Sequence, residues 1–325
     1  MQGTRTIWSG QNFHPVVQKL WKDANQFNTC LTTLAMACFY KCSHAGDLDM
    51  PADRIVQSID EAGDSIGLDS SAHFELCWRE LVQSPDTFQD ERYYRLITGE
   101  DHPLGNFAII SDASNVSAAV EAASPLLDVG APAAVFSCAE VSDVMSDRLN
   151  AMGFSVVDTM PAMAVDIAGI SPTQLPTGYE AARVTSGEEA SAWINVLAEG
   201  YPLPSSLARK FSPEVCEASS GVDASAQWFA IRREGKVVAT SMLYLAGGLA
   251  GVYCVATQPE ERGKGLGAHV TAEALKAGQQ AGYKVGVLQS SEAGHSIYLA
   301  LGFRDVGNVY AFMQLAETDS PETNV

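Results

Sequence analysis

Short apolar runs alternate along the chain with longer stretches in which apolar residues recur every three or four positions. Continuous apolar runs between turn residues are typical of buried strands, and helical spacing over a longer stretch is typical of helices. In the first half, these patterns predict helices at 13–21, 28–41, 116–127 and 141–152, and strands at 92–98, 105–111 and 133–138. This mixture of elements indicates an α/β protein.

A stretch with several glycines and prolines at 166–177 is the best candidate for a linker between two halves. The strand predicted at 178–184 is expected to start a new sheet. The next helix, at 186–197, should begin at Ser186, because Glu189 three residues later completes a capping box. The pattern then predicts a helix at 206–211, a hairpin of strands at 228–233 and 236–244 that turns at Glu234-Gly235, and a strand at 249–257.

The two halves carry a similar short segment. Residues 149–154 read LNAMGF and residues 298–303 read YLALGF, and each segment ends a predicted helix. A glycine in the left-handed conformation closes a helix, and the following phenylalanine packs back on it. Each segment is expected to lead into a β-hairpin. We interpret this as a degenerate internal repeat.

Composition narrows the function classes. A chain of 325 residues is long enough for about two domains. Its net charge of −19, with scattered basic residues, argues against nucleic acid or an anionic membrane as a partner. Seven cysteines without a C-x-x-C pair fit a reduced, cytoplasmic setting. The widely separated His14, His44 and His73 give no ligand spacing, so no metal is expected.

A glycine-rich turn lies between a predicted strand and a predicted helix. The β-rich run at 252–255 is followed by Arg262-Gly263-Lys264-Gly265-Leu266-Gly267, which opens into a stretch with apolar residues at helical spacing. Glycines let the backbone bend sharply and approach a ligand closely. The first amides of a helix lack internal partners, and the helix dipole favours an anion there. The segment therefore predicts a phosphate site.

Three kinds of phosphate loop can be compared with this segment. A Walker A loop needs Ser or Thr after Gly-Lys, but Gly265 follows Lys264. A Rossmann fingerprint needs G-x-G-x-x-G and an acidic residue about twenty positions later, and neither is present. The remaining pattern, R-x-x-G-x-G from Arg262 to Gly267, resembles the pyrophosphate loop of the GNAT superfamily of acetyl-CoA-dependent N-acetyltransferases.

A second segment strengthens this resemblance. Residues 288–303, LQSSEAGHSIYLALGF, resemble the second GNAT motif, in which a fifth strand leads to a short helix that carries a tyrosine and then to Leu-Gly-Phe and a hairpin. Tyr298 and the segment 301–303 match that motif. Many members have Asn at the position of Ser291, so contacts made by that Asn are not carried over.

The resemblance spans residues 175–315 and implies an α/β (α+β) fold of two GNAT-like domains, each a mixed, mostly antiparallel sheet flanked by helices. A degenerate copy with a helical N-terminal part is expected at 1–170, a catalytic domain at 171–316 and a disordered acidic tail at 317–325. The first copy lacks both R-x-x-G-x-G and a tyrosine matching Tyr298, so it is not expected to bind acetyl-CoA in the usual way.

The family resemblance also implies a chemistry and its residues. Acetyl-CoA would be the acetyl donor, and the acceptor would be a primary amine of a small molecule or peptide. Tyr298 is expected to be the general acid that protonates the leaving thiolate. The residues expected to hold the donor are Cys254, Val255, Ala256, Thr257, Arg262, Gly263, Lys264, Gly265, Leu266, Gly267, Ser290 and Ser291.

Several alternatives stay open at this point. The general base could be Glu199, Tyr201, Tyr244, Tyr253, Glu292 or a chain of waters. The protein could instead be a non-catalytic acyl-CoA sensor that keeps the cofactor loop, or a nucleotide-binding oxidoreductase. A tandem of domains could be a monomer that mimics the common GNAT dimer, or a homodimer.

Overall fold

The computed structural model describes residues 55–82, 84–185, 187–215 and 225–314. The helices predicted at 13–21 and 28–41, His14, His44 and the tail at 317–325 lie outside the described residues.

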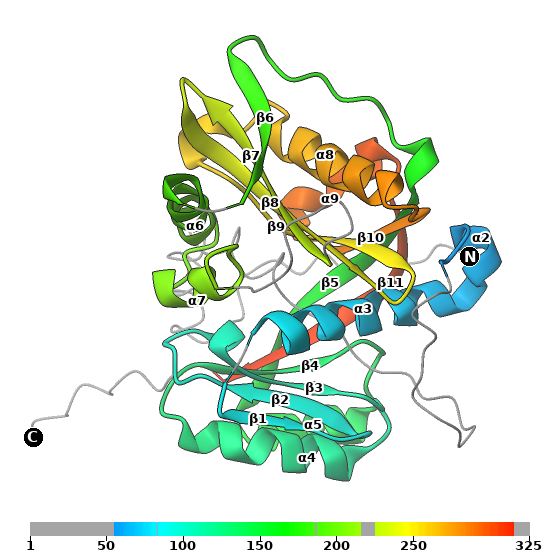
Figure 1. The fold of residues 1–325 in the computed structure, drawn as a ribbon. Coiled ribbons are helices and arrows are strands. Elements are labelled where there is room, and N and C mark those ends of the chain that lie inside the picture. The colour runs from blue at the N-terminus through cyan, green and yellow to red at the C-terminus, as the bar shows by residue number, and fades with distance from the viewer. Residues whose placement is uncertain (1–54, 83, 186, 216–224, 315–325) are drawn as a thin grey trace, which may run out of the picture.

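The described residues form one eleven-stranded sheet in the order β1-β2-β3-β4-β11-β5-β10-β9-β8-β7-β6 (Figure 1). The strands are β1 (Asp86–Gln89), β2 (Tyr93–Ile97), β3 (Asn106–Ile110), β4 (Ala133–Ser137), β5 (Phe154–Asp166), β6 (Tyr179–Val184), β7 (Ala226–Arg233), β8 (Lys236–Ala246), β9 (Leu249–Thr257), β10 (Val285–Gln289) and β11 (Arg304–Gln314). Two adjacent pairs are parallel, β3 with β4 and β9 with β10, and the other pairs are antiparallel.

Helices cover both faces of this sheet. They are α2 (Ile59–Ala62), α3 (Ile66–Leu81), α4 (Val116–Ala123), α5 (Asp143–Ala151), α6 (Glu188–Gly200), α7 (Ser205–Lys210), α8 (Leu266–Gln280) and α9 (Glu292–Leu301). Val252 of β9 belongs to the apolar core under α8 and α9, whereas its neighbour Tyr253 belongs to the core with α3 and α6. Because successive side chains of a strand point to opposite faces, the two cores lie on opposite faces of the sheet. The mixed α/β class with a mostly antiparallel, helix-flanked sheet is confirmed.

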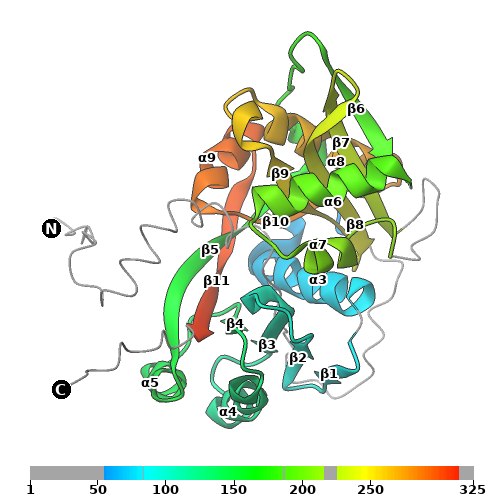
Figure 2. The ribbon, with the colours of Figure 1, turned by 90° about the vertical axis from the view of Figure 1, so that its left-hand side faces the viewer.

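The order of elements in the first half returns in the second half. The series β3-α4-β4-α5-β5 has the same order as β9-α8-β10-α9-β11, with a parallel strand pair in each series. The last strands of the two series are exchanged: β5 pairs with β10, β11 pairs with β4, and β5 and β11 pair with each other along the middle (Figure 2). That the first half is a degenerate GNAT-like copy, bounded near residue 170, stays a prediction.

This exchange corrects two expectations. The strand expected at 178–184 does not start a new sheet, because β6 is the edge strand of the same sheet. The two Gly-Phe segments do not lead into hairpins, because β5 and β11 are long single strands that find their partners in each other and in the other half. The helix ends are as predicted: Gly153 and Gly302 have φ of +90° and +103°.

The start of α6 also differs from the expectation. The predicted cap, Ser186, lies outside the described residues, and the helix begins at Glu188 after Gly187, whose φ is +73°. The Glu189 carboxylate pairs with the Arg232 guanidinium on β7, and the capping box, which needs Ser186, stays a prediction. The predicted hairpin is confirmed, and its turn has positive φ at Glu234 (+51°) and Gly235 (+76°), as a type I′ turn requires.

Candidate functional site

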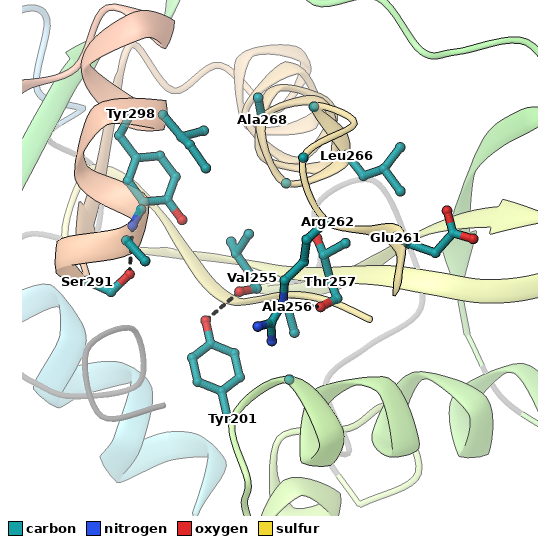
Figure 3. Close-up of a pocket in the computed structure, with 17 residues that line it drawn as sticks. Tyr201, Val255, Ala256, Thr257, Glu261, Arg262, Leu266, Ala268, Ser291 and Tyr298 are labelled. Carbon is teal, nitrogen blue, oxygen red and sulfur yellow. Dashed lines mark hydrogen bonds between the residues drawn. The ribbon is translucent and has the colours of Figure 1, made fainter. Parts of the chain in front are cut away.

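A pocket of about 440 Å³ lies where β9 and β10 separate, between the end of α6, the start of α8 and the inner face of α9 (Figure 3). Ten of the residues predicted from the sequence line it: Val255, Ala256, Thr257, Arg262, Gly263, Gly265, Leu266, Gly267, Ser291 and Tyr298. The two sequence motifs therefore meet in one pocket.

The gap between the strands follows from the register of their backbone pairing. In the parallel ladder, Ala250 pairs with Gly286 and Gly251 with Val287, and no pair follows although β9 continues to Thr257. Cys254 has a φ of +54°, which is rare for a residue with a side chain, and it lies where the register with β8 shifts. The Thr240 hydroxyl donates a hydrogen bond to the Cys254 carbonyl oxygen (2.9 Å) and stabilises this bulge. Cys254 itself does not line the pocket.

The glycine loop has the geometry of an anion site. After the short 3-10 turn Pro259–Glu261, Gly263 and Gly265 have φ of +75° and +77°. Gly265 is the N-cap residue of α8, and no side chain makes a capping hydrogen bond there. A Cβ on Gly267 would come no closer than 3.8 Å to any neighbouring atom, so the loop is open on that side. The first amides of α8 therefore face the pocket without a protein side chain to satisfy them.

The two cations of the loop have different surroundings. Arg262 lines the pocket, and its Nε donates to the Thr257 carbonyl oxygen at 3.1 Å. Lys264 does not line the pocket, because its Nζ lies 2.6 Å from the Glu261 carboxylate. Glu261 also accepts hydrogen bonds from the Tyr179 hydroxyl (2.5 Å) and the Arg233 guanidinium (2.8 Å). These donors, Lys264 first, lower the pKa of Glu261 to about 2, so the carboxylate is charged.

Tyr298 is placed on α9 with its ring over the gap (Figure 3). The side chain is 4% exposed, and its ring packs edge-on against Phe303. Burial raises the pKa of the phenol, while Thr271 acts in the opposite direction, so the group stays protonated near neutral pH. A Cβ on Gly294 would lie 3.0 Å from the Tyr298 ring, so a larger residue there would require the ring to shift.

The two serines have structural contacts at the start of α9. The Ser291 hydroxyl oxygen accepts a hydrogen bond from the Gly294 amide (2.9 Å) and caps the helix. Ser290 is fully buried, and its hydroxyl donates to the Ser291 carbonyl oxygen (2.8 Å). Ser291 lines the pocket and Ser290 does not.

Of the candidates for the general base, only Tyr201 is among the described residues that line this pocket, and its hydroxyl donates to the Val255 carbonyl oxygen (2.5 Å). The Tyr244 hydroxyl donates to Glu80, and the buried Tyr253 is bonded to His73. Glu199 and Glu292 are exposed side chains outside the pocket lining.

Other lining residues had no assigned role from sequence reasoning: Gly200, Glu261, Ala268, Ala293, Gly294 and Ile297. Helical spacing could have identified three of these lining residues, because Ala293, Gly294 and Ile297 lie on the same face of α9 as Tyr298. Gly200 is required by close packing, since a Cβ there would lie 2.7 Å from Cβ of Ala256.

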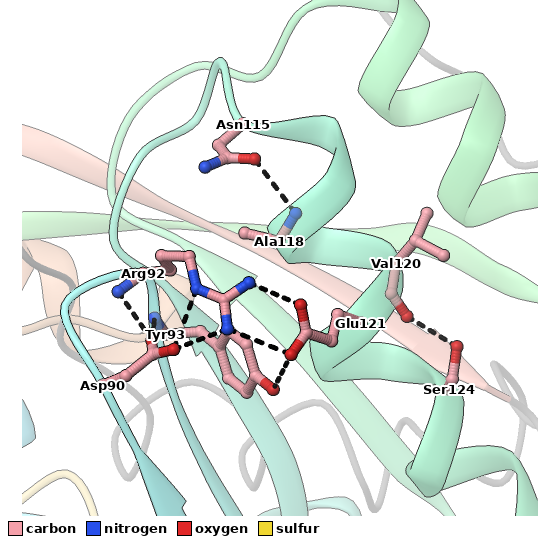
Figure 4. Close-up of polar contacts among 8 residues, drawn as sticks. All are labelled: Asp90, Arg92, Tyr93, Asn115, Ala118, Val120, Glu121 and Ser124. Atoms are coloured by element: carbon pink, nitrogen blue, oxygen red, sulfur yellow. Dashed lines mark hydrogen bonds and ion pairs between the residues drawn. The ribbon is translucent and has the colours of Figure 1, made fainter.

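The corresponding helix start in the first half is closed. At the N-terminus of α4, the Asn115 side chain accepts a hydrogen bond from the Ala118 amide (3.0 Å) (Figure 4). An Asp112 carboxylate oxygen accepts from the Ser114 amide at 2.8 Å. Further along α4, Glu121 pairs with Arg92 at the start of β2. Side chains thus already occupy the place of an anion, which is a physical reason to expect no acetyl-CoA there.

Comparison with protein families agrees with the geometry of the pocket. Residues 192–303 match the acetyltransferase (GNAT) family model. This segment is a GNAT domain. It contains most of α6, the glycine loop and α9, and every described residue that lines the pocket.

Solved structures show the same fold over a longer stretch. A GCN5-related N-acetyltransferase from Kribbella flavida is 22% identical, with a TM-score of 0.58, and the match covers 77% of this chain and 96% of that one. A GCN5-related N-acetyltransferase from Sphaerobacter thermophilus is 16% identical, with a TM-score of 0.55 and coverage of 83% and 96%. At these identities the likeness concerns the fold. No curated protein gives a significant match.

The described residues show neither a metal centre nor a membrane span. They contain no group of three or more His, Cys, Asp or Glu side chains arranged to hold a metal ion. None of the helices described is both long and apolar enough to cross a membrane.

Proposed function

We propose that the protein is an acetyl-CoA-dependent N-acetyltransferase that transfers the acetyl group directly to a primary amine of a small molecule or peptide. The observation that carries this proposal is the meeting of three features in one pocket: the uncapped glycine loop at α8, the open gap beside β9, and the protonated Tyr298. We also propose that the protein works in the cytoplasm, as a monomer or homodimer.

The residues present fit the donor. The free amides at the start of α8 would bind its diphosphate, with Arg262 as the nearest cation on the pocket side. The segment of β9 from Val255 to Thr257 has no pairing with β10, and the pantetheine chain would lie along it in place of that strand. Bound there, the donor supplies an activated acetyl thioester.

The chain itself would supply orientation and a proton. A backbone amide of β9 beside the Cys254 bulge would polarise the carbonyl group, as in an oxyanion hole. Tyr298 would hold its phenolic proton until a thiolate develops next to it, because burial disfavours its charged form. For the removal of the amine proton, Tyr201 and a water chain are both candidates, and Tyr201 is the one that lines the pocket.

One observation favours a second candidate function, a non-catalytic acyl-CoA sensor. Among the described lining residues, Glu261 is the sole carboxylate, and three donors already occupy it. No histidine lines the pocket in the part of the chain that the structure describes. A module that only binds acyl-CoA needs the loop and the gap but no base.

Calorimetric titration with acetyl-CoA, free CoA and NADPH tests the proposal first. We expect one acetyl-CoA per chain and no NADPH binding. Turnover with a library of primary amines is then compared between the wild type, Tyr298→Phe and the control Tyr283→Phe, which changes a tyrosine outside the pocket.

An enzyme should lose about 100-fold or more in kcat in Tyr298→Phe, with unchanged acetyl-CoA affinity, while the control keeps its activity. A protein that binds acetyl-CoA but turns over no amine would favour the sensor. A wild type that does not bind CoA would refute both candidates.

A further inference from the structure

Helix α3 comes from the first half and lies across β5, β11, β9 and β8, on the face of the sheet opposite α8 (Figure 1). This position brings α3 under the point where β9 and β10 separate. The GNAT family match begins at residue 192, so α3 lies well outside it.

Both β9 and β10 are bonded to α3 by a side chain two residues beyond the last pair of the ladder between them. With Gly251 paired to Val287, continuing the register would bring Tyr253 opposite Gln289. Instead, the Gln289 side-chain amide donates to the hydroxyl (3.2 Å) and the carbonyl oxygen (3.3 Å) of Ser70. The Tyr253 hydroxyl lies 2.7 Å from Nδ1 of His73.

The protonation of His73 follows from its second partner. Its Nε2 lies 3.2 Å from the Leu249 carbonyl oxygen, which can only accept a hydrogen bond. Nε2 therefore carries the proton, and Nδ1 accepts the hydrogen bond from the Tyr253 hydroxyl. Ser70, His73, Tyr253 and Gln289 are all at most 2% exposed, so these bonds are not exchanged with water.

The ring of His73 also touches the backbone at the end of the ladder. A Cβ on Gly251, the last paired residue of β9, would lie 2.4 Å from the His73 ring. Near the start of α3, a Cβ on Gly67 would lie 2.3 Å from the Val306 carbonyl oxygen of β11. Two glycines thus let α3 lie directly against the sheet, and they fix its distance from the strands.

Such a contact matters because an open gap between parallel strands is unstable. Unpaired backbone N–H and C=O groups on facing strands have a strong tendency to pair with each other. The gap is therefore kept open only when each strand is held elsewhere. Here β10 is held by Gln289 and by the hydrogen bond from the Ser290 amide to the Pro161 carbonyl oxygen (2.9 Å), and β9 is held by Tyr253.

We propose that α3 is part of the donor site, with His73 and Ser70 as positioning residues that hold β9 and β10 apart at the width that the pantetheine chain of acetyl-CoA requires. This inference rests on the proposed function, because it assigns the device that shapes the same gap. Residues of the first half then help to shape the binding site of the second half.

The test separates the gap from the glycine loop by using two ligands. Acetyl-CoA needs both, whereas 3′-phosphoadenosine 5′-diphosphate carries the diphosphate without the pantetheine chain. The variants are His73→Ala and Gln289→Leu, of which the second removes both bonds to Ser70 while filling the same space. Leu81→Ala, at the far end of α3 and also in the core, is the matched control for a general loss of stability.

We expect calorimetry to show that both test variants weaken acetyl-CoA binding by about tenfold while binding of the diphosphate fragment stays within about twofold, and that Leu81→Ala changes neither. The inference is overturned when both variants bind acetyl-CoA as the wild type does. It is also overturned when they lose both ligands equally, which would indicate a general structural role. A wild type that binds the fragment but not acetyl-CoA would instead refute the proposed function.

Discussion

Replacing Gly265 with alanine tests whether the glycine loop works through its backbone shape. Gly265 has φ of +77° and ψ of 8°, and a Cβ there would meet no atom within 4 Å. The cost of the substitution is therefore conformational and not steric. A residue with a side chain in this left-handed conformation costs about 1–2 kcal/mol. Removing a glycine from the unfolded chain returns about 0.4–1 kcal/mol of that cost.

The remaining strain of about 1 kcal/mol must appear in one of two measurements. A loop that keeps its shape lowers the free energy of unfolding, measured in urea. A loop that relaxes turns the first amides of α8 away from the pocket. Binding of acetyl-CoA must then restore the original loop conformation, and this cost raises the Kd for acetyl-CoA by about fivefold to tenfold. We therefore expect the losses in unfolding free energy and in binding free energy to add up to about 1 kcal/mol.

Gly267→Ala is the matched control for this experiment. Gly267 is helical, and a Cβ there makes only ordinary contacts, the nearest with Thr257 Oγ1 at 3.8 Å. Alanine in a helix is favoured over glycine by about 0.5–1 kcal/mol, so this control, which concerns unfolding only, should keep or gain stability. A Gly265→Ala variant with wild-type stability and wild-type affinity would refute the backbone argument.

Two further predictions concern charge. Glu261→Gln removes the carboxylate that joins Lys264, Arg233 and Tyr179. Because the pKa of Glu261 is lowered, the carboxylate stabilises the fold above pH 4.5, and this stabilisation is lost as the pH falls towards 2. The free energies of unfolding of variant and wild type, measured in urea, should therefore converge over that range. Burial lowers the pKa of His73 and of His102 from 6.5 to about 4, so each should contribute up to about 3 kcal/mol of stability above pH 6.5 that is lost as the pH falls through 4. In His102→Gln, the free energy of unfolding should change less between pH 6.5 and pH 4 than in the wild type. An unchanged dependence on pH would contradict the lowered pKa of His102.

Local chemistry made much of this structure predictable from the sequence. Apolar runs marked β2, β3, β4 and β9 to within a residue or two, because buried strands need them wherever their partners lie. Glycines with positive φ marked the loop and both helix ends, because few other residues adopt that conformation. The residues expected to hold the donor therefore meet around one pocket, apart from Cys254, Lys264 and Ser290, which do not line it, and their role stays a prediction.

The features that were not predicted depend on partners far away in the sequence. Lys264 was expected to face the ligand, but Glu261, Tyr179 and Arg233 meet next to it, and the last two come from β6 and β7. His73 was one of three unrelated histidines in the sequence, and its contact with Tyr253 spans 180 positions. A strand pattern also cannot say which strand is the neighbour, so the exchange of β5 and β11 was expected as two hairpins.

The exchanged strands explain why a half without an anion site is nevertheless needed. β10 pairs over its full length with β5 of the first half, from Val285–Asp166 to Gln289–Ala162. Without β5, one edge of β10 would be unpaired next to a gap that is already open on the other edge, and a short strand with two free edges is not stable. β5 therefore completes the sheet beside the gap, and α3 closes it from below. Loss of β5 would remove the strand that pairs with β10, and loss of α3 would remove the helix that is bonded to Tyr253 and Gln289.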